Sequence, residues 1–410
     1  MAARKKTFVG FGFGAIQTGL FLWEAQQSGN FDRLVVAMTN DQVVAAIRRA
    51  RGRFRINVAA QSGRKVCEVS GVEIFNPRVT ADRFALVAAI AEASELATAL
   101  PSVETYEQED ASAAGLLAEG LRAKLRQTSP TRCILCAAEN HNHAAEILSA
   151  CIVKHLTASE AKGLAGVFQP LNTVIGKMSR VVRDPAEITD AGLLPFVEGG
   201  ARAYLVEEFN RIFVSQVTLP GFKRGITVFA EKPDLLPFEE AKLYGYNAAH
   251  ALLGYLCRQR GFRFVAEAAK DRELMRFVRE AFLEESGRAL IARHANVDDL
   301  FTPEGYRAFA DDLLERMVNP WLRDDVDRVT RDPRRKLGWD DRLVGTMRLA
   351  LAAGIEPRRL AIGAAAALDR LEREEQAKTG ADLLNDIWAG ASATPGEKSA
   401  VHARILAAQR

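Results

Sequence analysis

Short apolar runs alternate with longer segments of helical spacing along the first half of the chain. The apolar runs, each short enough for one buried strand, cover residues 7–10, 34–38 and 133–138. The segments with apolar residues at helical spacing cover residues 15–27, 41–50, 80–100 and 111–126. Near-continuous apolar strands separated by helices are typical of a parallel sheet that is covered on both faces. The pattern therefore predicts an α/β domain.

The second half of the chain has a different pattern. Residues 166–229 are mixed, with strand-like runs at 212–219 and 226–229, and helical spacing dominates from about residue 237 onward. The clearest of these later helices are predicted at residues 274–291, 303–317 and 360–373. We therefore expect an α/β domain over residues 1–230 and an all-α domain over residues 231–410.

Glycines cluster where the first predicted strand turns into the first helix. The turn contains Gly10, Gly12, Phe13, Gly14, Gln17 and Gly19. Glycine lets the backbone turn tightly and approach a pyrophosphate, whose charge the helix N-terminus stabilises. The spacing lacks the third glycine of the standard dinucleotide-binding pattern, because Gln17 stands there. Its position at the start of a βαβ unit favours a dinucleotide site over a merely tight turn.

The end of the second predicted strand normally carries an Asp or Glu that binds the adenosine ribose of NAD. Met38 stands at this position, so no carboxylate is available there. Asn40 could bond a ribose hydroxyl, while Asp41 is expected to cap the next helix. Arg48 and Arg49 lie about two turns inside that helix, which argues against direct contact with a 2′-phosphate. The choice between NAD and NADP stays open, with NAD slightly favoured.

Composition and charge remove several classes of protein. The 410 residues are 48% hydrophobic and 26% charged, as in ordinary globular proteins. The 55 Lys and Arg residues against 52 Asp and Glu leave a net charge of only +3, so a nucleic-acid partner is not expected. The five scattered cysteines indicate reduced thiols in a cytoplasm rather than a disulfide framework.

The N-terminal segment superficially resembles a secretory signal. Arg4, Lys5 and Lys6 precede a largely apolar run over residues 7–23. The glycines of this run weaken a helix and suit a strand that leads into a tight turn. No later apolar run approaches the roughly 20 residues that a membrane-spanning helix needs. We therefore expect a soluble, cytoplasmic protein without a membrane partner.

Cys133 and Cys136, with two histidines shortly after them, have the spacing of a metal site. Residues three apart in a strand point to opposite faces, however, so the two thiols cannot easily converge on one ion. Buried structural cysteines and no bound metal are therefore expected here. Glu139 and Asn140 directly follow this predicted strand, at the edge where open parallel sheets bind their ligands.

The motif Lys242-Leu-Tyr-Gly-Tyr-Asn247-Ala-Ala-His250 lies on a predicted helix. At 100° per residue, His250 lies about 80° and Asn247 about 140° around the helix from Lys242, so all three occupy one side. A desolvated lysine with a lowered pKa can take the proton of a secondary alcohol, and an asparagine amide can hold the nascent carbonyl oxygen. The alternative is a solvated Lys242 and Asn247 beside a His250 that makes a core hydrogen bond.

Acidic and basic residues interleave closely over residues 316–342. The basic members of this segment are Arg316, Arg323, Arg328, Arg331, Arg334, Arg335, Lys336 and Arg342. A solvated surface of mutually paired charges is one interpretation. The other is an arginine fork near a cleft, which would suit a phosphate or several hydroxyl groups.

Together these motifs resemble those of the polyol-specific long-chain dehydrogenases, the mannitol dehydrogenase family. The shared features occur in the same order and comprise the glycine turn, Glu139-Asn140, Lys242-x4-Asn247-x2-His250 and Arg316-x-x-Asn319-Pro320. Residues 331–343 look most like the mannitol-1-phosphate 5-dehydrogenase branch, and the resemblance covers residues 7–370.

The resemblance implies a doubly wound, Rossmann-like parallel-sheet domain followed by an all-α substrate domain. It also implies a zinc-independent, NAD(P)-dependent enzyme that interconverts a secondary alcohol of a linear polyol, or of its phosphate, and the matching ketose. Lys242 would be the general base, Asn247 and Asn140 would polarise the carbonyl oxygen, and His250 would orient the substrate and Lys242. The expected cofactor-binding residues are Gly12, Phe13, Gly14, Gly19, Met38, Asn40 and Glu139. The expected substrate-binding residues are Asn172, Lys177, Arg316 and Asn319.

One departure from the family pattern bears on the substrate. Members commonly have Val-Asp-Arg where this chain has Ile175-Gly176-Lys177, which removes an acceptor for a substrate hydroxyl and adds a cation. A substrate phosphate or carboxylate is then expected at Lys177 or within residues 331–342. The alternative enzyme is a free-polyol or hexuronate oxidoreductase, of the mannitol 2-dehydrogenase or tagaturonate reductase type. The alternative outside enzymes is a non-catalytic dinucleotide-binding sensor.

Overall fold

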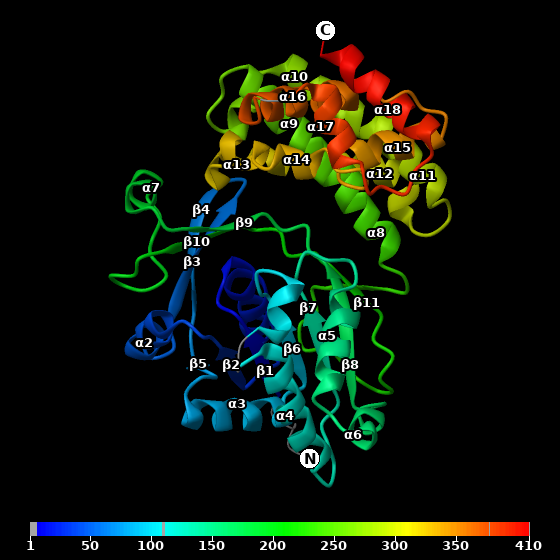
Figure 1. The fold of residues 1–410 in the computed structure, drawn as a ribbon. Helices are drawn as coiled ribbons and strands as arrows, with labels where there is room; N and C mark the ends of the chain where they lie inside the picture. Colours follow the sequence, from blue (N-terminus) through cyan, green and yellow to red (C-terminus); the bar gives the residue numbers. More distant parts are fainter. Residues whose placement is uncertain (1–5, 109–110, 377, 410) are drawn as a thin grey trace. The chain divides into compact units, whose positions relative to one another are not determined.

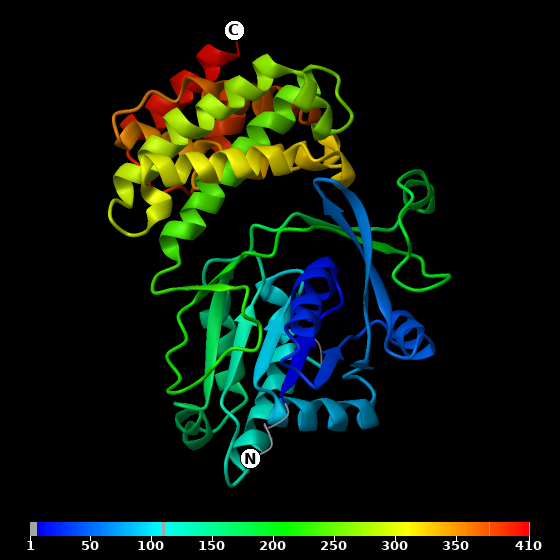
Figure 2. The ribbon, with the colours of Figure 1, turned by 180° about the vertical axis from the view of Figure 1, so that it is seen from behind.

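A computed structural model describes residues 6–108, 111–376 and 378–409. Two compact units make up the chain, Met1–Leu235 and Leu236–Arg410, and Figures 1 and 2 show them from opposite sides. Arg4 and Lys5, which begin the signal-like segment, lie outside the described residues. Within the described ranges, no helix combines the length and the apolar character needed to cross a membrane. The five cysteines are free thiols.

An eight-stranded sheet is the centre of the first unit. Its strands lie in the order β12 (Ala230–Lys232), β11 (Phe213–Ser215), β8 (Phe168–Val174), β7 (Cys133–Ala137), β6 (Glu95–Thr98), β1 (Thr7–Phe11), β2 (Arg33–Ala37), β5 (Val72–Phe75). All pairings from β8 to β5 are parallel. This six-strand stretch has the 3-2-1-4-5-6 order of a Rossmann fold, which confirms the predicted doubly wound sheet. The strand order reverses between β1 and β6.

Helices cover one face of this sheet, and Cys133 belongs to that side. The covering helices are α3 (Thr80–Glu92), α4 (Ala113–Leu125) and α5 (Ala144–Lys154), which share a buried cluster with Val9, Val35 and Leu135. Cys136 belongs to the cluster on the other face. The two cysteines therefore point to opposite faces, as predicted from their spacing.

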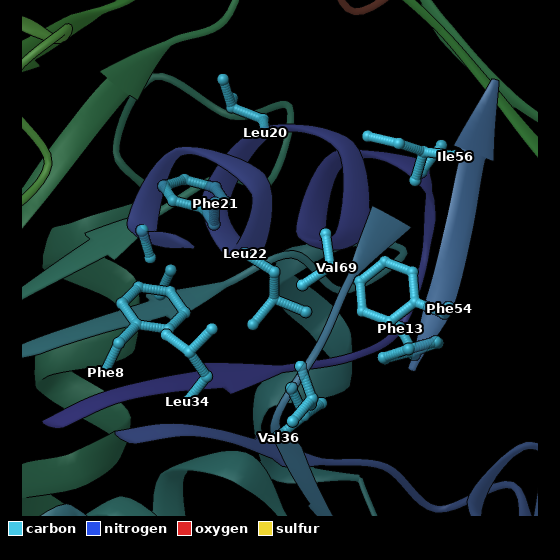
Figure 3. Close-up of a cluster of buried hydrophobic side chains, with 14 of the residues drawn as sticks. Phe8, Phe13, Leu20, Phe21, Leu22, Leu34, Val36, Phe54, Ile56 and Val69 are labelled. Carbon is cyan, nitrogen blue, oxygen red and sulfur yellow. The ribbon is translucent and has the colours of Figure 1, made fainter. Parts of the chain in front are cut away.

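The other face packs against η1 (Gln17–Leu22), α2 (Asp41–Arg49) and a second sheet. Figure 3 shows Phe8, Leu34 and Val36 of the large sheet close to η1 and to this smaller sheet. The smaller sheet has the order β4 (Gly63–Val69), β3 (Phe54–Ala60), β10 (Ala203–Glu207), β9 (Ser179–Val182). Sequence patterning did not predict it, because β4 and β9 carry mostly exposed or half-buried residues.

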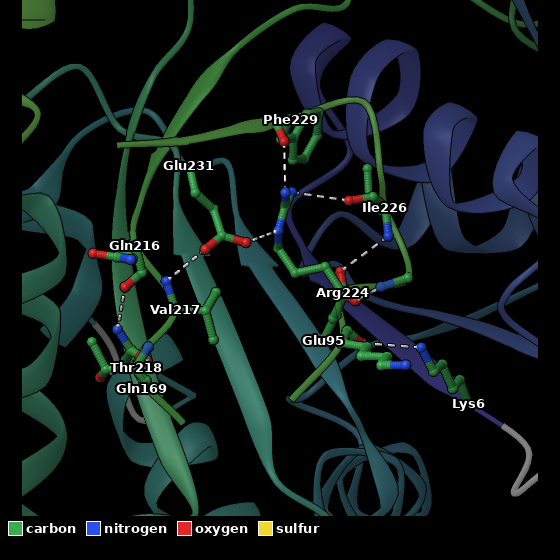
Figure 4. Close-up of polar contacts among 12 residues, drawn as sticks. Lys6, Glu95, Gln169, Gln216, Val217, Thr218, Arg224, Ile226, Phe229 and Glu231 are labelled. Carbon is green, nitrogen blue, oxygen red and sulfur yellow. Dashed lines mark hydrogen bonds and ion pairs between the residues drawn. The ribbon is translucent and has the colours of Figure 1, made fainter. Parts of the chain in front are cut away.

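Two expectations for the first unit were wrong. The helix predicted over residues 80–100 ends at Glu92, and β6 begins at Glu95, whose buried carboxylate accepts backbone N–H groups of Gly225 and Ile226. Residues 226–229 form no strand. Figure 4 shows the reason: Arg224 donates to the carbonyls of Ile226 and Phe229, so side chains satisfy backbone groups that a strand would pair.

Shorter elements complete the first unit. They are α1 (Trp23–Ser28), η2 (Val103–Glu107), α6 (Ala158–Gly163) and α7 (Pro185–Asp190).

The described part of the second unit consists of helices joined by turns. They are α8 (Leu236–Glu240), η3 (Ala241–Asn247), α9 (Ala248–Gln259), η4 (Val265–Lys270), α10 (Arg272–Glu280), η5 (Ala281–Gly287), α11 (Arg288–Arg293), η6 (Asp299–Phe301), α12 (Pro303–Met317), η7 (Pro320–Leu322), α13 (Val326–Thr330), α14 (Pro333–Lys336), α15 (Val344–Ala352), α16 (Arg358–Glu374), α17 (Gly380–Ile387) and α18 (Pro395–Ala408). Helix α9 contacts α10, α13 and α16, and nearly every residue from Ala248 to Cys257 is buried. The predicted catalytic motif runs from η3 into the first turn of this central helix.

Candidate functional site: a dinucleotide groove and a cationic pocket

The glycine-rich turn follows β1 directly. Gly12 has φ +90°, and a Cβ there would lie 2.8 Å from the Ala99 carbonyl oxygen, so only glycine fits. Nothing lies within 4 Å of the place where a Cβ on Gly14 would be, although Gly14 lines the adjoining groove. The turn therefore offers both the tight bend and the open backbone that a pyrophosphate requires.

Phe13 anchors this turn to the second sheet. Its ring is 3% exposed and packs edge-on against Phe54, Phe196 and Tyr204, with centroids 5.0, 6.4 and 6.0 Å away. The Tyr204 hydroxyl donates to the Phe13 carbonyl oxygen at 2.7 Å. Phe13 thus holds the shape of the turn through its buried ring, while the turn lines the groove.

The missing third glycine is compensated elsewhere in the structure. The buried Gln17 amide lies against Gly10, where a Cβ would come within 2.0 Å of Gln17 Nε2. Neither Gln17 amide atom has a hydrogen-bond partner among the described residues. Gly19 packs on β10, because a Cβ there would lie 2.5 Å from Val206 Cγ1. Gly19 therefore serves helix–sheet packing and does not line the groove, contrary to the expectation that it contacts the cofactor.

A groove of about 620 Å³ opens where the strand order reverses. Besides the glycine turn, its lining includes Met38, Leu100, Ala138, Arg183 and Arg202. Open α/β sheets bind nucleotides at this place, and the groove is large enough for an extended ligand. The residues present therefore fit a dinucleotide.

The end of β2 differs in detail from expectation. Met38 lines the groove as predicted, and no carboxylate stands at its position. Asn40, not Asp41, caps α2, because its side chain accepts the Val43 N–H at 3.0 Å. The Asp41 carboxylate instead accepts the Asn76 amide at 2.6 Å. The Asn40 side-chain oxygen is therefore engaged in a helix cap, and a contact between its exposed amide and a ribose stays a prediction.

Two residues after β7 have different environments. Glu139 is buried, and its carboxylate accepts the Thr98 hydroxyl and the Leu100 N–H, both at 2.9 Å, as well as the Tyr106 hydroxyl. Glu139 therefore shapes the loop after β6, and it does not line the groove. Asn140 is exposed directly after it, and its role toward a carbonyl oxygen stays a prediction.

Two predicted substrate contacts instead support the first unit. The Lys177 ammonium donates to the Phe209 carbonyl at 2.9 Å and to Asn210 Oδ1 at 2.6 Å, and a further bond goes to the Glu207 carbonyl. Asn172 accepts the Ala145 N–H at 2.8 Å at the start of α5. Because these groups are engaged within the fold, their placement does not support the roles expected of them.

The predicted catalytic motif begins on a π-helical turn. Lys242 and Asn247 both belong to η3, and His250 lies in the first turn of α9. A π-helix joins residue i to residue i+5 by hydrogen bonds, which is the spacing of Lys242 and Asn247. The angles expected for an α-helix therefore do not hold, and these two residues lie one turn apart on the same side.

Side chains from two other helices hold this π-turn in place. The Tyr244 carbonyl accepts the Ser286 hydroxyl at 2.7 Å and the Thr346 hydroxyl at 3.1 Å. A Cβ on Gly245 would lie 2.6 Å from the Tyr306 hydroxyl, so glycine permits the close approach of η3 and α12. The Tyr244 carbonyl of the π-turn thus has two side-chain hydrogen-bond donors. π-Turns of this kind occur frequently at functional sites.

Lys242 has the properties of a base near neutral pH. Part of its side chain reaches the surface, but its ammonium is surrounded by protein atoms. Burial and then the positive charge of Arg342 lower the pKa of Lys242 to about 8, against a smaller opposing effect of Glu239. A substantial fraction of Lys242 is therefore neutral and able to accept a proton at mildly alkaline pH.

His250 is oriented by a buried carboxylate that sequence reasoning missed. His250 Nε2 lies 2.9 Å from Asp324 Oδ2, and the ring stacks on Tyr246 at 5.9 Å. Burial would raise the pKa of Asp324, but the hydrogen bond to His250 and the charge of Arg328 outweigh it and hold this pKa at about 2. Because an ionised carboxylate only accepts, Nε2 carries a hydrogen.

A small cationic pocket adjoins these residues. It measures about 110 Å³, and its lining includes Asn247, His250, Arg328, Arg331, Arg335, Lys336 and Arg342. None of the described residues that line it is acidic. The segment of interleaved charge does form ion pairs, among them Arg342 with Asp341 at 2.7 Å. Arg328 pairs with Asp324, and Arg331 and Arg335 lie 3.8 and 3.9 Å from Asp332. Five cationic residues nevertheless line one hollow beside two predicted catalytic residues.

Arg316 and Asn319 lie at the end of α12 and do not line this pocket. Arg316 is 8% exposed and pairs with Asp312 at 3.1 Å. Asn319 accepts the Trp321 N–H at 2.9 Å and so caps η7. Their expected contacts with substrate stay predictions. Among the described residues, no group of three or more His, Cys, Asp or Glu side chains could hold a metal ion.

Comparison with known proteins places the chain in a family. Residues 234–407 match the family model of the mannitol dehydrogenase C-terminal domain. A mannitol-1-phosphate 5-dehydrogenase of Bacillus licheniformis is 31% identical over 362 residues, which cover 87% of this chain and 86% of the relative.

Two solved structures share the fold at low sequence identity. One is a D-sorbitol dehydrogenase in substrate-free form, at 15% identity and a TM-score of 0.76, covering 99% of this chain and 92% of the other. The second is the Pseudomonas fluorescens mannitol 2-dehydrogenase in a ternary complex with NAD and D-mannitol, at 16% identity and a TM-score of 0.72, covering 100% and 92%. The chain belongs to the mannitol dehydrogenase family.

Proposed function

We propose that the protein is a nicotinamide-dinucleotide-dependent dehydrogenase that oxidises a secondary alcohol of a linear polyol phosphate to the matching ketose phosphate, reversibly. The observation that carries this proposal is the cationic pocket beside Asn247 and His250. A neutral polyol needs no such concentration of positive charge, whereas arginine forks suit a phosphate in shape and charge. The 31% identical relative, a mannitol-1-phosphate 5-dehydrogenase, supports the same substrate class.

Lys242 is the base in this proposal. Oxidation of a CH–OH group removes a hydride from carbon and a proton from oxygen, so that a C=O bond forms. With a pKa lowered to about 8, Lys242 takes the hydroxyl proton in its neutral form and returns it in the direction of ketose reduction. Asn247, one π-turn away, donates to the oxygen on which negative charge develops.

His250 orients the substrate rather than taking its proton. Asp324 fixes the ring by accepting from Nε2, which leaves Nδ1 to face other partners. Arg328, Arg331, Arg335, Lys336 and Arg342 bind the phosphate, so the alcohol beside Lys242 is selected by its distance from that phosphate.

The glycine turn and the adjoining groove hold the dinucleotide in this proposal. The backbone at Gly12 and Gly14 and the following residues as far as Ile16, which line the groove, receive the pyrophosphate. Met38 lies where the adenosine ribose is bound in Rossmann folds. When bound, the dinucleotide supplies the acceptor for the hydride. Because no carboxylate at residue 38 repels a 2′-phosphate, NAD is expected to be favoured only slightly over NADP.

A substrate panel tests the proposal. Linear polyol 1-phosphates, free polyols and hexonates are each offered with NAD and with NADP, and nicotinamide absorbance is followed. The proposal predicts the highest kcat/KM for a polyol phosphate, at least about ten-fold above the matching free polyol. Equal or better turnover of a free polyol would contradict the phosphate assignment. Preference for a hexonate would reassign the pocket to a carboxylate, the other anion that arginines recognise.

A further inference from the structure

Two arginines that flank paired strands of the smaller sheet line the dinucleotide groove. Strands β9 and β10 pair antiparallel, and their last pair is Val182 opposite Ala203. Arg183 directly follows β9 and Arg202 directly precedes β10, so both lie just beyond the same end of this strand pair. Both line the groove that contains the glycine turn. Two positive charges at neighbouring positions repel each other, and an anion between or beside the guanidinium groups would relieve this repulsion.

Neither arginine has an acidic partner in the structure. Among the described residues, Arg183 and Arg202 make no ion pair with Asp or Glu, whereas Arg180 of β9 pairs with Glu187. Asp184, next to Arg183, instead caps α7 by accepting the Ala186 N–H at 2.9 Å. Glu187 therefore balances the charge of Arg180, while no carboxylate among the described residues pairs with Arg183 or Arg202 at the groove.

The position of Arg202 connects this pair to the phosphate-binding turn. Its guanidinium lies beside the Tyr204 hydroxyl, and that hydroxyl donates to the Phe13 carbonyl between Gly12 and Gly14. Arg183 is exposed and Arg202 half-buried, so both remain accessible to a ligand in the groove. A phosphate at the turn would thus lie within the reach of long arginine side chains.

We infer that Arg183 and Arg202 form a phosphate-binding pair for the dinucleotide, contributed by the smaller sheet rather than by the Rossmann strands. The inference rests on the proposed dinucleotide-dependent function. The shared ligand chemistry is a phosphate of the dinucleotide, and two phosphates are possible sources: the pyrophosphate of NAD and NADP, and the 2′-phosphate of NADP. Met38, which lines the same groove, is uncharged. The two arginines therefore supply positive charge for a cofactor phosphate that residue 38 does not.

Binding of NAD and of NADP to the full-length protein, measured by isothermal titration calorimetry without substrate, tests the inference. The variants are Arg183→Gln and Arg202→Gln, with Arg202→Lys to retain the charge if glutamine disturbs the fold. The matched control is Lys65→Gln, which removes one charge from β4 of the same sheet, outside the groove. Each arginine variant is expected to raise Kd about ten-fold, the effect of losing one charge-assisted hydrogen bond, and Lys65→Gln less than two-fold.

The two cofactors separate the possible sources. An equal rise of Kd for NAD and NADP assigns the pair to the pyrophosphate, and a rise for NADP alone assigns it to the 2′-phosphate; either supports the inference. Unchanged Kd values for both cofactors in both glutamine variants would overturn it while leaving the proposed function intact. If the unmodified protein binds neither dinucleotide, the proposed function fails, and the inference fails with it.

Discussion

Replacement of Asp324 by asparagine should weaken both the second unit and catalysis. Asp324 is 3% exposed, with one carboxylate oxygen 2.9 Å from His250 Nε2 and the other 3.0 Å from Arg328 Nε. Its pKa falls from 3.8 to about 2, because the contacts with His250 and Arg328 outweigh the cost of burial. Such a lowering of the pKa corresponds to about 2 kcal/mol, which is the expected loss of unfolding free energy at pH 7.

The sign of the pH dependence follows from the lowered pKa. A carboxyl group whose folded pKa is depressed stabilises the protein above its unfolded pKa, near 4, and loses this contribution as the pH falls through about 2. The difference in stability between the native protein and Asp324→Asn should therefore be constant from pH 5 to pH 7. It should shrink below pH 4, as far as the native protein stays folded there.

Urea unfolding and steady-state kinetics measure the two effects of this substitution. Tryptophan fluorescence reports on the second unit through Trp321, Trp339 and Trp388, and a Trp23→Phe background removes the signal of the first unit. The matched control is Asp327→Asn, whose exposed carboxylate pairs with Arg258 and should contribute little. Asp324→Asn should also lower kcat/KM about 10- to 100-fold, because His250 loses its orientation. Native stability and native kcat/KM in Asp324→Asn would refute this account of His250.

Three further changes test other parts of the structure. Burial and the charges of Arg342 and Arg335 lower the pKa of Lys336 to about 7. Because Lys336 loses its positive charge as the pH rises, KM for a polyol phosphate should rise about ten-fold between pH 7 and pH 9. Lys336→Arg, which keeps the charge, should flatten this rise. Gln17→Met should increase the unfolding free energy by about 1 kcal/mol, since both amide atoms are buried without partners among the described residues; a clear loss of Tm would show that the amide has a polar partner. The double variant Ser286→Ala/Thr346→Val removes both hydroxyls that bind the Tyr244 carbonyl. It should reduce kcat about ten-fold and leave Kd for the dinucleotide unchanged. Ser286→Ala/Thr346→Ser, which restores one hydroxyl, should recover part of the loss.

The Rossmann core could be predicted from the sequence because its strands are buried on both faces. β1, β2 and β7 appear as uninterrupted apolar runs, and their observed bounds differ from the predicted ones by a residue or so. β6 was hidden inside a predicted helix, since an alanine-rich run continues past Glu92 and Glu95 is an unusual residue for a buried strand. Its carboxylate is satisfied by backbone groups about 130 residues later in the chain, and no local pattern reports such a contact.

In the candidate site too, local sequence patterns predicted some residues, while contacts between distant parts of the chain could not be predicted. Local spacing was enough to select Lys242, Asn247 and His250, but it could not show the π-turn, which depends on Ser286 and Thr346 from other helices. Asp324 lies 74 residues from His250 and was one acidic residue among many in a charged segment. Lys177, Asn172 and Asn40 are polar residues that bond to backbone groups of the fold. Lys177 and Asn172 also bond to the side chains of Asn210 and Glu146. From the residue type alone, a polar side chain that bonds within the fold cannot be distinguished from one that binds a ligand.

The pH dependence of kcat for polyol phosphate oxidation, with native protein and with Lys242→Ala, tests the central claim most directly. In the native protein, kcat should rise with pH through one ionisation near pH 8, because burial and Arg342 lower the pKa of Lys242 to about 8 and only its neutral form accepts the proton. Ketose reduction should fall over the same range. Lys242→Ala should lose this ionisation and about 10²–10⁴-fold in kcat, while dinucleotide binding by the first unit is retained. Near-native kcat with an unchanged pH profile in Lys242→Ala would show that Lys242 is not the base.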